Sequence, residues 1–110
     1  MSGYFVLNKS GTSQFHFVLK ADNHETILSS EVYQSKMAAQ GGIASVQSNS
    51  PFDIRYEKKQ SVKNEPYFVL KATNGQIIGT SQMYASTQAR DAGILSVKLN
   101  GSSTKIVEKP

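Results

Sequence analysis

Apolar and polar residues alternate between Gln14 and Lys20, which is typical of a β-strand with one buried face. The residues on the apolar side are Phe15, Phe17 and Leu19. Those on the other side are His16, Val18 and Lys20. Shorter runs at 4–7 and 25–30 predict one strand before this segment and one after it. The Gly11-Thr12-Ser13 stretch between the first two runs has the composition of a turn.

The pattern returns 51 residues later, where Phe68 and Leu70 take the places of Phe17 and Leu19. Without a gap, 16 of the 33 positions from 17 to 49 are identical to their counterparts at 68–100. A period of this length is one supersecondary unit, so each copy supports the interpretation of the other. The second copy predicts strands near 55–58, 66–71 and 76–81.

Each copy then changes to a helical period. Ser35 and Ser86 have the position and chemistry of helix N-caps. The predicted buried stripes are Ala38, Gly42, Ile43 and Val46, and Ala89, Gly93, Ile94 and Val97. Because glycine lowers helix stability, its recurrence in both stripes suggests that each helix lies very close to the sheet there.

Residues typical of turns mark the ends of the predicted strands and helices. Asn74-Gly75 predicts a two-residue hairpin, with Asn23-His24 in the same place in the first copy. Asn49 and Asn100-Gly101 predict left-handed helix ends.

Residues 104–109 repeat the first strand of the second copy and predict a last strand. The expected fold is α+β: strand-strand-strand-helix twice, plus a final strand, in one shared antiparallel sheet. Two helices would pack on one face, with pseudo-two-fold symmetry. Half the chain would bury too little surface alone, so we expect a single domain, 1–110, made of repeats 1–51 and 52–110.

The composition adds limits on function. The chain has no cysteine, which excludes disulfides and thiolate chemistry and fits a reducing compartment. No apolar run is long enough for a signal peptide or a membrane span, so we expect a cytoplasmic protein. The net charge of +4 lies entirely in residues 51–110, which carry nine basic and five acidic side chains. A charge this small favours a solubilising surface over a dedicated anionic partner.

The run from Phe68 to Ile78, then Ser81 to Ser86, then Gly93 to Asn100, resembles the YegP-like family of uncharacterised prokaryotic proteins. The first copy carries the same pattern, with His24 where the motif has glycine and Gln47 where it has lysine. The resemblance implies tandem units joined into one sheet, with terminal strands that could cross between units, and single-unit relatives that dimerise. It implies no biochemical function.

The sequence shows no recognisable arrangement of catalytic or metal-binding side chains. His16 and His24 are replaced by Tyr67 and Gly75 in the other copy and have no acidic partners at metal-ligand spacing. There is no Gly-x-Ser-x-Gly elbow and no P-loop. We therefore expect no enzyme activity, no catalytic residues, no metal and no cofactor.

Polar residues retained in both copies are better candidates for a function, although asparagine, serine and tyrosine also have structural explanations as turn formers, caps and packing groups. They are Asn23, Ser30, Tyr33 and Ser35 with Asn74, Ser81, Tyr84 and Ser86. Lys20 and Lys71 are harder to explain structurally, unless they guard a sheet edge or face.

If the helices cover only the apolar face, the other face is open and carries rings beside cations. Such a face can hold single-stranded nucleic acid by base stacking and phosphate attraction. The candidate residues are His16, Lys20, Tyr67, Lys71, Arg55, Lys58, Lys59 and Lys63. Two alternatives stay open: a homodimer or protein-partner module using Val18, Val69 and Tyr67, and a small-ligand or enzyme site between the repeats.

Overall fold

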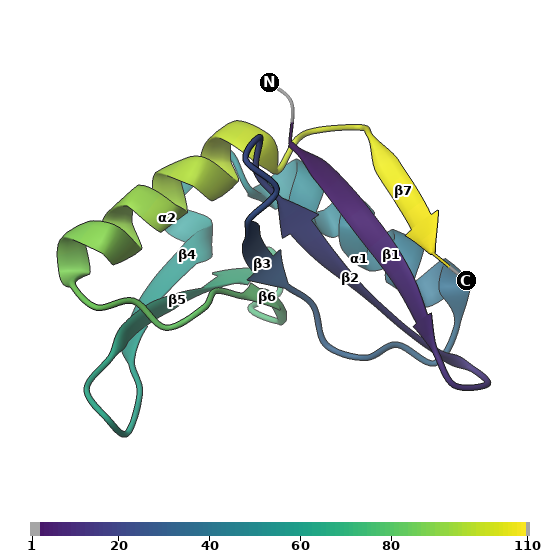
Figure 1. Ribbon diagram of the computed structural model, residues 1–110, viewed down its shortest axis with the longest axis horizontal. Coiled ribbons are helices and arrows are strands. Elements are labelled where there is room, and N and C mark those ends of the chain that lie inside the picture. The colour runs from purple at the N-terminus through teal and green to yellow at the C-terminus, as the bar shows by residue number, and fades with distance from the viewer. Residues whose placement is uncertain (1–2, 110) are drawn as a thin grey trace.

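A computed structural model describes residues 3–109, and the strands and helices follow the repeat closely (Figure 1). The first half contains β1 (Tyr4–Ser10), β2 (Gln14–Lys20), β3 (Thr26–Ser29) and α1 (Lys36–Asn49). A 3-10 turn η1 (Asp53–Arg55) leads into β4 (Tyr56–Gln60), β5 (Pro66–Lys71), β6 (Ile77–Thr80), α2 (Thr87–Asn100) and β7 (Ile106–Lys109). The α+β class and the order strand-strand-strand-helix, twice, plus a final strand are confirmed.

The strands form one seven-stranded sheet in the order β4-β5-β6-β3-β2-β1-β7. The two halves join through β3 and β6, where Ser29 pairs with Thr80 in antiparallel fashion. The sheet is mixed, because β7 runs parallel to β1. The expectation of a wholly antiparallel sheet was therefore wrong at this last strand.

The parallel pair follows from the repeat itself. After α1 the chain crosses to the other half and forms β4 on the edge of β5. After α2 it crosses back, but β1 already occupies the equivalent edge of β2. β7 is thus displaced to the outer edge of β1. β1 runs antiparallel to β2, just as β4 runs antiparallel to β5. By the symmetry of the repeat, β7 enters the first half in the direction that β4 has in the second half, so it runs parallel to β1.

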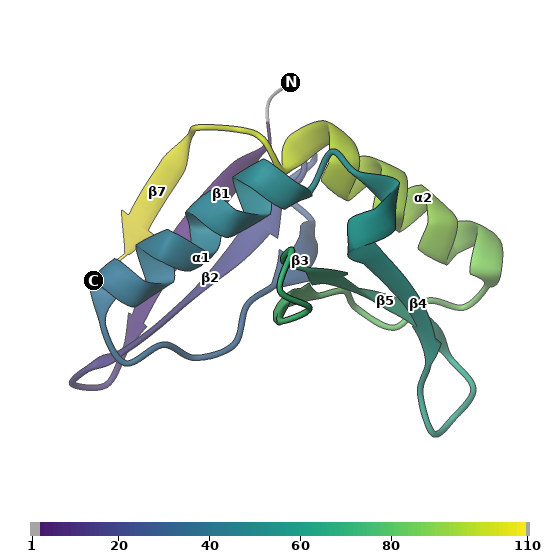
Figure 2. The same cartoon turned by 180° about the vertical axis from the view of Figure 1, so that it is seen from behind.

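The core is shared between the halves. Each helix contacts strands of both repeats: α1 packs on β2, β5 and β6, and α2 packs on β5, β3 and β2. Buried side chains from the sheet and both helices form one cluster that includes Phe17, Phe68, Ile43 and Val97. Figure 1 shows the hairpins β1–β2 and β4–β5 as the legs of an arch, and Figure 2 shows α1 lying along the first leg.

The helices begin where the sequence predicts. The Ser35 and Ser86 side chains accept hydrogen bonds from the amides of Ala38 and Ala89, each at 3.0 Å. In α1, however, the buried stripe starts at Ala39, and Ala38 is exposed. Ala39 fits the i, i+3, i+4, i+7 spacing of one helix face. Its counterpart in the second copy is Arg90, so the comparison of the two copies did not indicate that Ala39 is buried.

The helix ends differ from expectation. Ser50 and Gly101, the two C-cap residues, have right-handed backbone with φ of −59° and −68°, not left-handed backbone. Gly101 is instead required by a close approach, because a Cβ there would overlap Ser50 Oγ. Ser50 and Gly101 are equivalent in the repeat, so the two helix ends meet on the pseudo-two-fold axis.

The turn between β2 and β3 is one residue longer than predicted. The amide of Ala21 donates to Glu25 O, and that of His24 donates to Ala21 O, which closes a three-residue loop. His24 takes a positive φ of 69°, and Gly75 takes 85° in the equivalent loop. Loops of this kind end in a left-handed residue and a bulge, and the pairings of β2 with β3 and of β5 with β6 both show a register shift there.

Candidate nucleic-acid interface

The face of the sheet turned away from the helices is named the open face. Because side chains alternate along a strand, Phe17 and Leu19 point into the core and their neighbours point the other way. Cross-strand register extends the face over the whole sheet. It carries Tyr4, Val6, His16, Val18 and Lys20 in one half, and Glu57, Lys59, Tyr67, Val69 and Lys71 in the other.

Two valines of the open face contribute little accessible surface, whereas Val18 is partly exposed. Val6 and Val69 are only 5% and 3% exposed, although they point away from the main core cluster. His16, Lys20, Tyr67 and Lys71 are partly exposed. The groups that a ligand could reach on this face are therefore the rings, the lysine side chains and Val18.

In the second half, two lysines flank one carboxylate. Lys71 Nζ lies 2.5 Å from Glu57 Oε1, and Lys59 Nζ lies 3.8 Å from Glu57 Oε2. The hydrogen bond from Lys71, followed by the charge of Lys59, lowers the pKa of Glu57. The trio keeps one net positive charge beside the Tyr67 ring, because Tyr67 lies opposite Lys59 in the ladder.

In the first half, the ring of Tyr4 contacts the ammonium group of Lys105, and the sequence pattern did not predict this pair. Lys105 Nζ lies 5.3 Å from the centre of the Tyr4 ring, a cation–π geometry. The Tyr4 hydroxyl shares a 2.8 Å hydrogen bond with His24 Nδ1, and Tyr4 lies opposite Lys20. Lys105 comes here because the chain leading to β7 passes beside β1, a long-range pairing with no local signal in the sequence.

Two of the predicted basic residues lie on the helix side of the sheet. Arg55 belongs to η1 and lines a hollow beside α1 with Ser45 and Ser48. Lys58 points toward α2, where its Nζ lies 3.4 Å from Asp91 Oδ1. The structure thus brings together His16, Lys20, Lys59, Tyr67 and Lys71 on one face, and it separates Arg55 and Lys58 from them.

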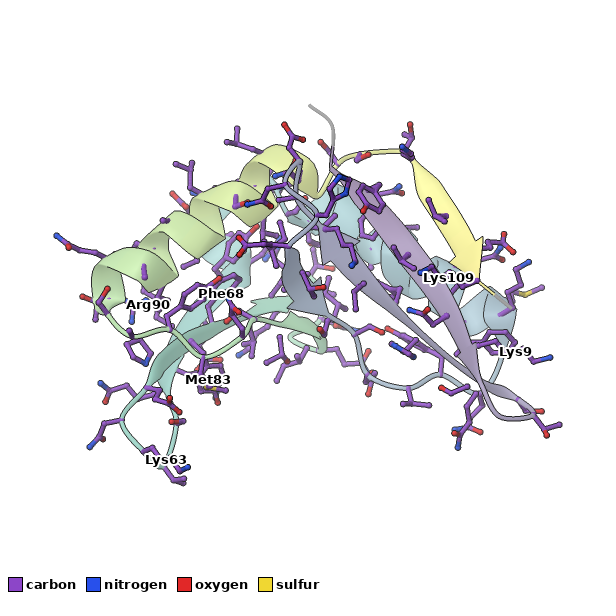
Figure 3. All side chains as sticks on the ribbon, viewed as in Figure 1. Lys9, Lys63, Phe68, Met83, Arg90 and Lys109 are labelled. Atoms are coloured by element: carbon purple, nitrogen blue, oxygen red, sulfur yellow. The ribbon has the colours of Figure 1, made fainter. Side chains whose placement is uncertain are left out.

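Lys63 lies apart from both groups, at the tip of the hairpin that joins β4 to β5 (Figure 3). Asp91, the partner of Lys58, accepts a hydrogen bond from Arg90 Nε, which is the main reason that its pKa is lowered. The positive charge of the second half is consequently spread over several surfaces.

The retained serines and asparagines have structural partners. Ser30 Oγ accepts the Phe17 amide at 2.9 Å and donates to Glu31 O at 2.7 Å. Ser81 Oγ makes the equivalent bonds with Phe68 and Gln82. Asn23 Oδ1 and Asn74 Oδ1 each accept the amide two residues later in their turns. Together with the caps at Ser35 and Ser86, these bonds explain why both copies keep these residues.

Tyr33 and Tyr84 pack against the core. Tyr33 stacks on Phe17 with ring centres 6.2 Å apart, and Tyr84 stacks on Phe68 at 6.4 Å. Burial raises the pKa of both phenols, as it does for Tyr56, whose hydroxyl donates to Ser50 O at 2.7 Å. The Tyr33 and Tyr84 hydroxyls lie against Gly42 and Gly93, respectively, so each glycine makes room for a ring.

Within residues 3–109, no three His, Asp or Glu side chains come close enough together to hold a metal ion. In the same part of the chain, neither helix has the length and apolar character needed to cross a bilayer.

Comparison with known proteins gives consistent matches. The sequence model of a domain of unknown function, DUF1508, matches twice, over residues 12–57 and 61–108. Each match therefore covers a hairpin, a helix and the strand after the helix. UPF0339 protein YegP of Escherichia coli O157:H7 is 60% identical over 106 residues, 96% of each chain. A UPF0339 protein of Bordetella pertussis is 61% identical over 107 residues, again 96% of each chain.

Two solution NMR structures share the fold. UPF0339 protein SO3888 of Shewanella oneidensis aligns with a TM-score of 0.92 and 57% identity, over 98% of this chain and 92% of that one. The E. coli protein yegP, described as a protein of unknown function, aligns with a TM-score of 0.92 and 58% identity, over 99% and 94%.

Proposed function

The chain belongs to the UPF0339 family of YegP-like proteins with tandem DUF1508 units, and we propose that it is a non-enzymatic module that binds single-stranded nucleic acid on its open face. One observation carries this proposal. In both halves, a ring and a lysine stand four residues apart on the side of the sheet that the helices leave uncovered: His16 with Lys20, and Tyr67 with Lys71.

The chemistry of these groups suits a flexible polyanion. Every base offers a flat face to a ring, and stacking on an aromatic side chain contributes about 1–3 kcal/mol per base. Lys20, Lys59 and Lys71 supply ammonium groups for phosphates, and Lys105 beside Tyr4 adds another at the far end of the first half. Glu57 limits the affinity, because a phosphate would compete with it for Lys71.

The non-enzymatic part of the proposal is supported by the shifted pKa values. Burial accounts for the tyrosines, and surface ion pairs with lysine or arginine account for Glu57 and Asp91. The furthest shifted of these groups is Tyr56, whose hydroxyl is already bonded to Ser50 O, so each shift has a structural cause other than a catalytic role.

The test is an NMR titration of the 15N-labelled protein with a random single-stranded RNA pool, at low salt and at about 0.15 M salt. We expect amide shifts at His16, Lys20, Tyr67 and Lys71 that weaken steeply as salt rises, because binding releases counterions from the phosphates. The double variant Tyr67→Ala, Lys71→Ala should lose most of the effect.

Lys58→Ala is the matched control, since it also removes one positive charge but from the helix side of the sheet. An absence of shifts at low salt would refute the proposal. Equal weakening by Lys58→Ala and by the double variant would show that the open face has no special role.

A further inference from the structure

The outer edge of β4 differs from its counterpart in the other half. β1 and β4 are equivalent in the repeat, and β7 covers the edge of β1. Within residues 3–109, no strand pairs with the outer edge of β4. An exposed edge of this kind offers unpaired backbone groups to an additional strand.

The register identifies those groups. Phe68 directs its amide to Ser81 Oγ and its carbonyl to the Ser81 amide, on the β6 side. Its neighbours Tyr67 and Val69 must then bond to β4, because bonding sides alternate along a strand. Their partners in β4 are Lys59 and Glu57. The N–H and C=O groups of the intervening Lys58 therefore point outward, and Lys58 is exposed.

A groove of about 660 Å³ runs between this edge and α2. Its apolar surface comes from Tyr56, Ile94 and Leu95, and its charged rim from Asp53, Glu57, Lys58, Asp91 and Lys98. Leu95 is 56% exposed, although leucine is a costly residue to leave in water. Its counterpart in α1, beside the covered edge, is Ala44, so at this position the larger apolar side chain stands beside the uncovered edge.

The first half shows how such an edge is covered. The Phe5 amide donates to Lys105 O at 2.9 Å as the chain enters β7. Glu108 of β7 pairs with Lys36 at the start of α1, at 2.6 Å. Gln47 near the end of α1 donates to Ser103 O at 2.9 Å. An extended segment is thus held both by the edge of β1 and by the helix beside it.

We propose that the groove between β4 and α2 binds an extended peptide segment of a partner protein as an additional strand parallel to β4. The backbone of Lys58 supplies the ladder bonds, as main-chain groups do in other cases of strand addition. β7 serves as the template for the ligand: Ile106 lies opposite Phe5, and Glu108 lies two residues further along, opposite Leu7. A matching peptide places an apolar side chain over Tyr56 and Leu95 and a carboxylate beside Lys58.

This surface lies on the other side of β4 from the open face, although Glu57 borders both, and the inference does not depend on nucleic-acid binding. Tyr56 and Lys58 point to the helix side, whereas Glu57 and Lys59 point to the open face. Changes confined to the groove should therefore leave the open face intact.

The experiment uses a synthetic peptide with the sequence of residues 102–110, added to the 15N-labelled full chain. We expect saturable amide shifts at Lys58, Gln60 and Leu95. The same peptide carrying Ile106→Asp should produce no shifts, because its apolar contact with the groove is lost. Both ends of each peptide are capped, because a free amino group at residue 102 would add a charge that the chain does not have there.

Three protein variants locate the site. Lys58→Pro removes an outward N–H without breaking a bond to β5, and Leu95→Glu places a charge in the groove; both should abolish the shifts. Leu99→Glu is the matched control, since Leu99 is 59% exposed one turn further along α2 and does not line the groove. It should bind as the unaltered chain does.

Four results would overturn the proposal. One is the absence of shifts at β4, and another is their persistence in Lys58→Pro. Shifts confined to Phe5 and Leu7 would mean that the peptide only exchanges with β7. Shifts at β4 that depend on protein concentration without peptide would mean that a second copy of the chain covers this edge.

Discussion

At the scale of single residues, Gly93 shows how tightly α2 approaches the chain beneath it. A Cβ at this position would overlap the Tyr84 hydroxyl oxygen, and Gly42 has the same relation to Tyr33. Each tyrosine ring is fixed in turn by its stack on Phe68 or Phe17. The sequence predicted a close approach at both glycines, but it did not identify a ring as the contacting group.

Gly93→Ala should destabilise the protein. Alanine favours the helix by about 1 kcal/mol, but overpacking against a ring that cannot move freely typically costs about 1–3 kcal/mol. We expect a net decrease in the free energy of unfolding, measured by urea denaturation. In a Tyr84→Phe background the loss should be smaller, because the nearest atom is gone.

Gly41→Ala is the control for this substitution. Gly41 is an exposed residue of α1, and a Cβ there would meet nothing within 4 Å. Only the propensity effect remains, so the free energy of unfolding should rise by about 0.5–1 kcal/mol. A loss of stability in Gly41→Ala equal to that in Gly93→Ala would contradict the explanation by contact with Tyr84.

At the scale of the elements, local rules account for what the sequence predicted. Strand alternation, the serine caps and the turn asparagines act over a few residues, and two copies of each signal were available. Local rules could not predict that β7 runs parallel to β1, because this direction depends on β1 already occupying the edge of β2. The positions of Arg55 and Lys58 were missed for the same reason: η1 and the register of β4 decide their side of the sheet.

Ser86→Ala should cost about 1 kcal/mol, because the Ala89 amide loses its side-chain acceptor at the start of α2. Ser86→Asp should retain most of the stability, since a carboxylate can accept the same bond and interacts favourably with the helix N-terminus. Thermal unfolding followed by circular dichroism measures both. Equal losses in the two variants would show that the cap bond contributes little.

At the scale of the whole molecule, the two halves are in contact at three places around the pseudo-two-fold axis. β3 pairs with β6 in the sheet, Ser50 meets Gly101 at the helix ends, and each helix contacts the segment that follows the other. The last of these contacts are Gln47 with Ser103 and Lys98 with Asp53. Neither repeat completes its core alone, because each helix packs on strands of both repeats.

The two halves should therefore unfold as one unit. Leu19 and Leu70 are equivalent, fully buried residues of the two halves, and truncation of either to alanine typically costs about 2–5 kcal/mol. Native-state hydrogen exchange would compare the opening free energies of core amides in β2 and β5. We expect Leu19→Ala to lower both values equally, and Leu70→Ala to do the same, because each cavity weakens the shared core. If Leu19→Ala lowered the protection of β2 and left that of β5 unchanged, the repeats would be separate folding units that only pack together.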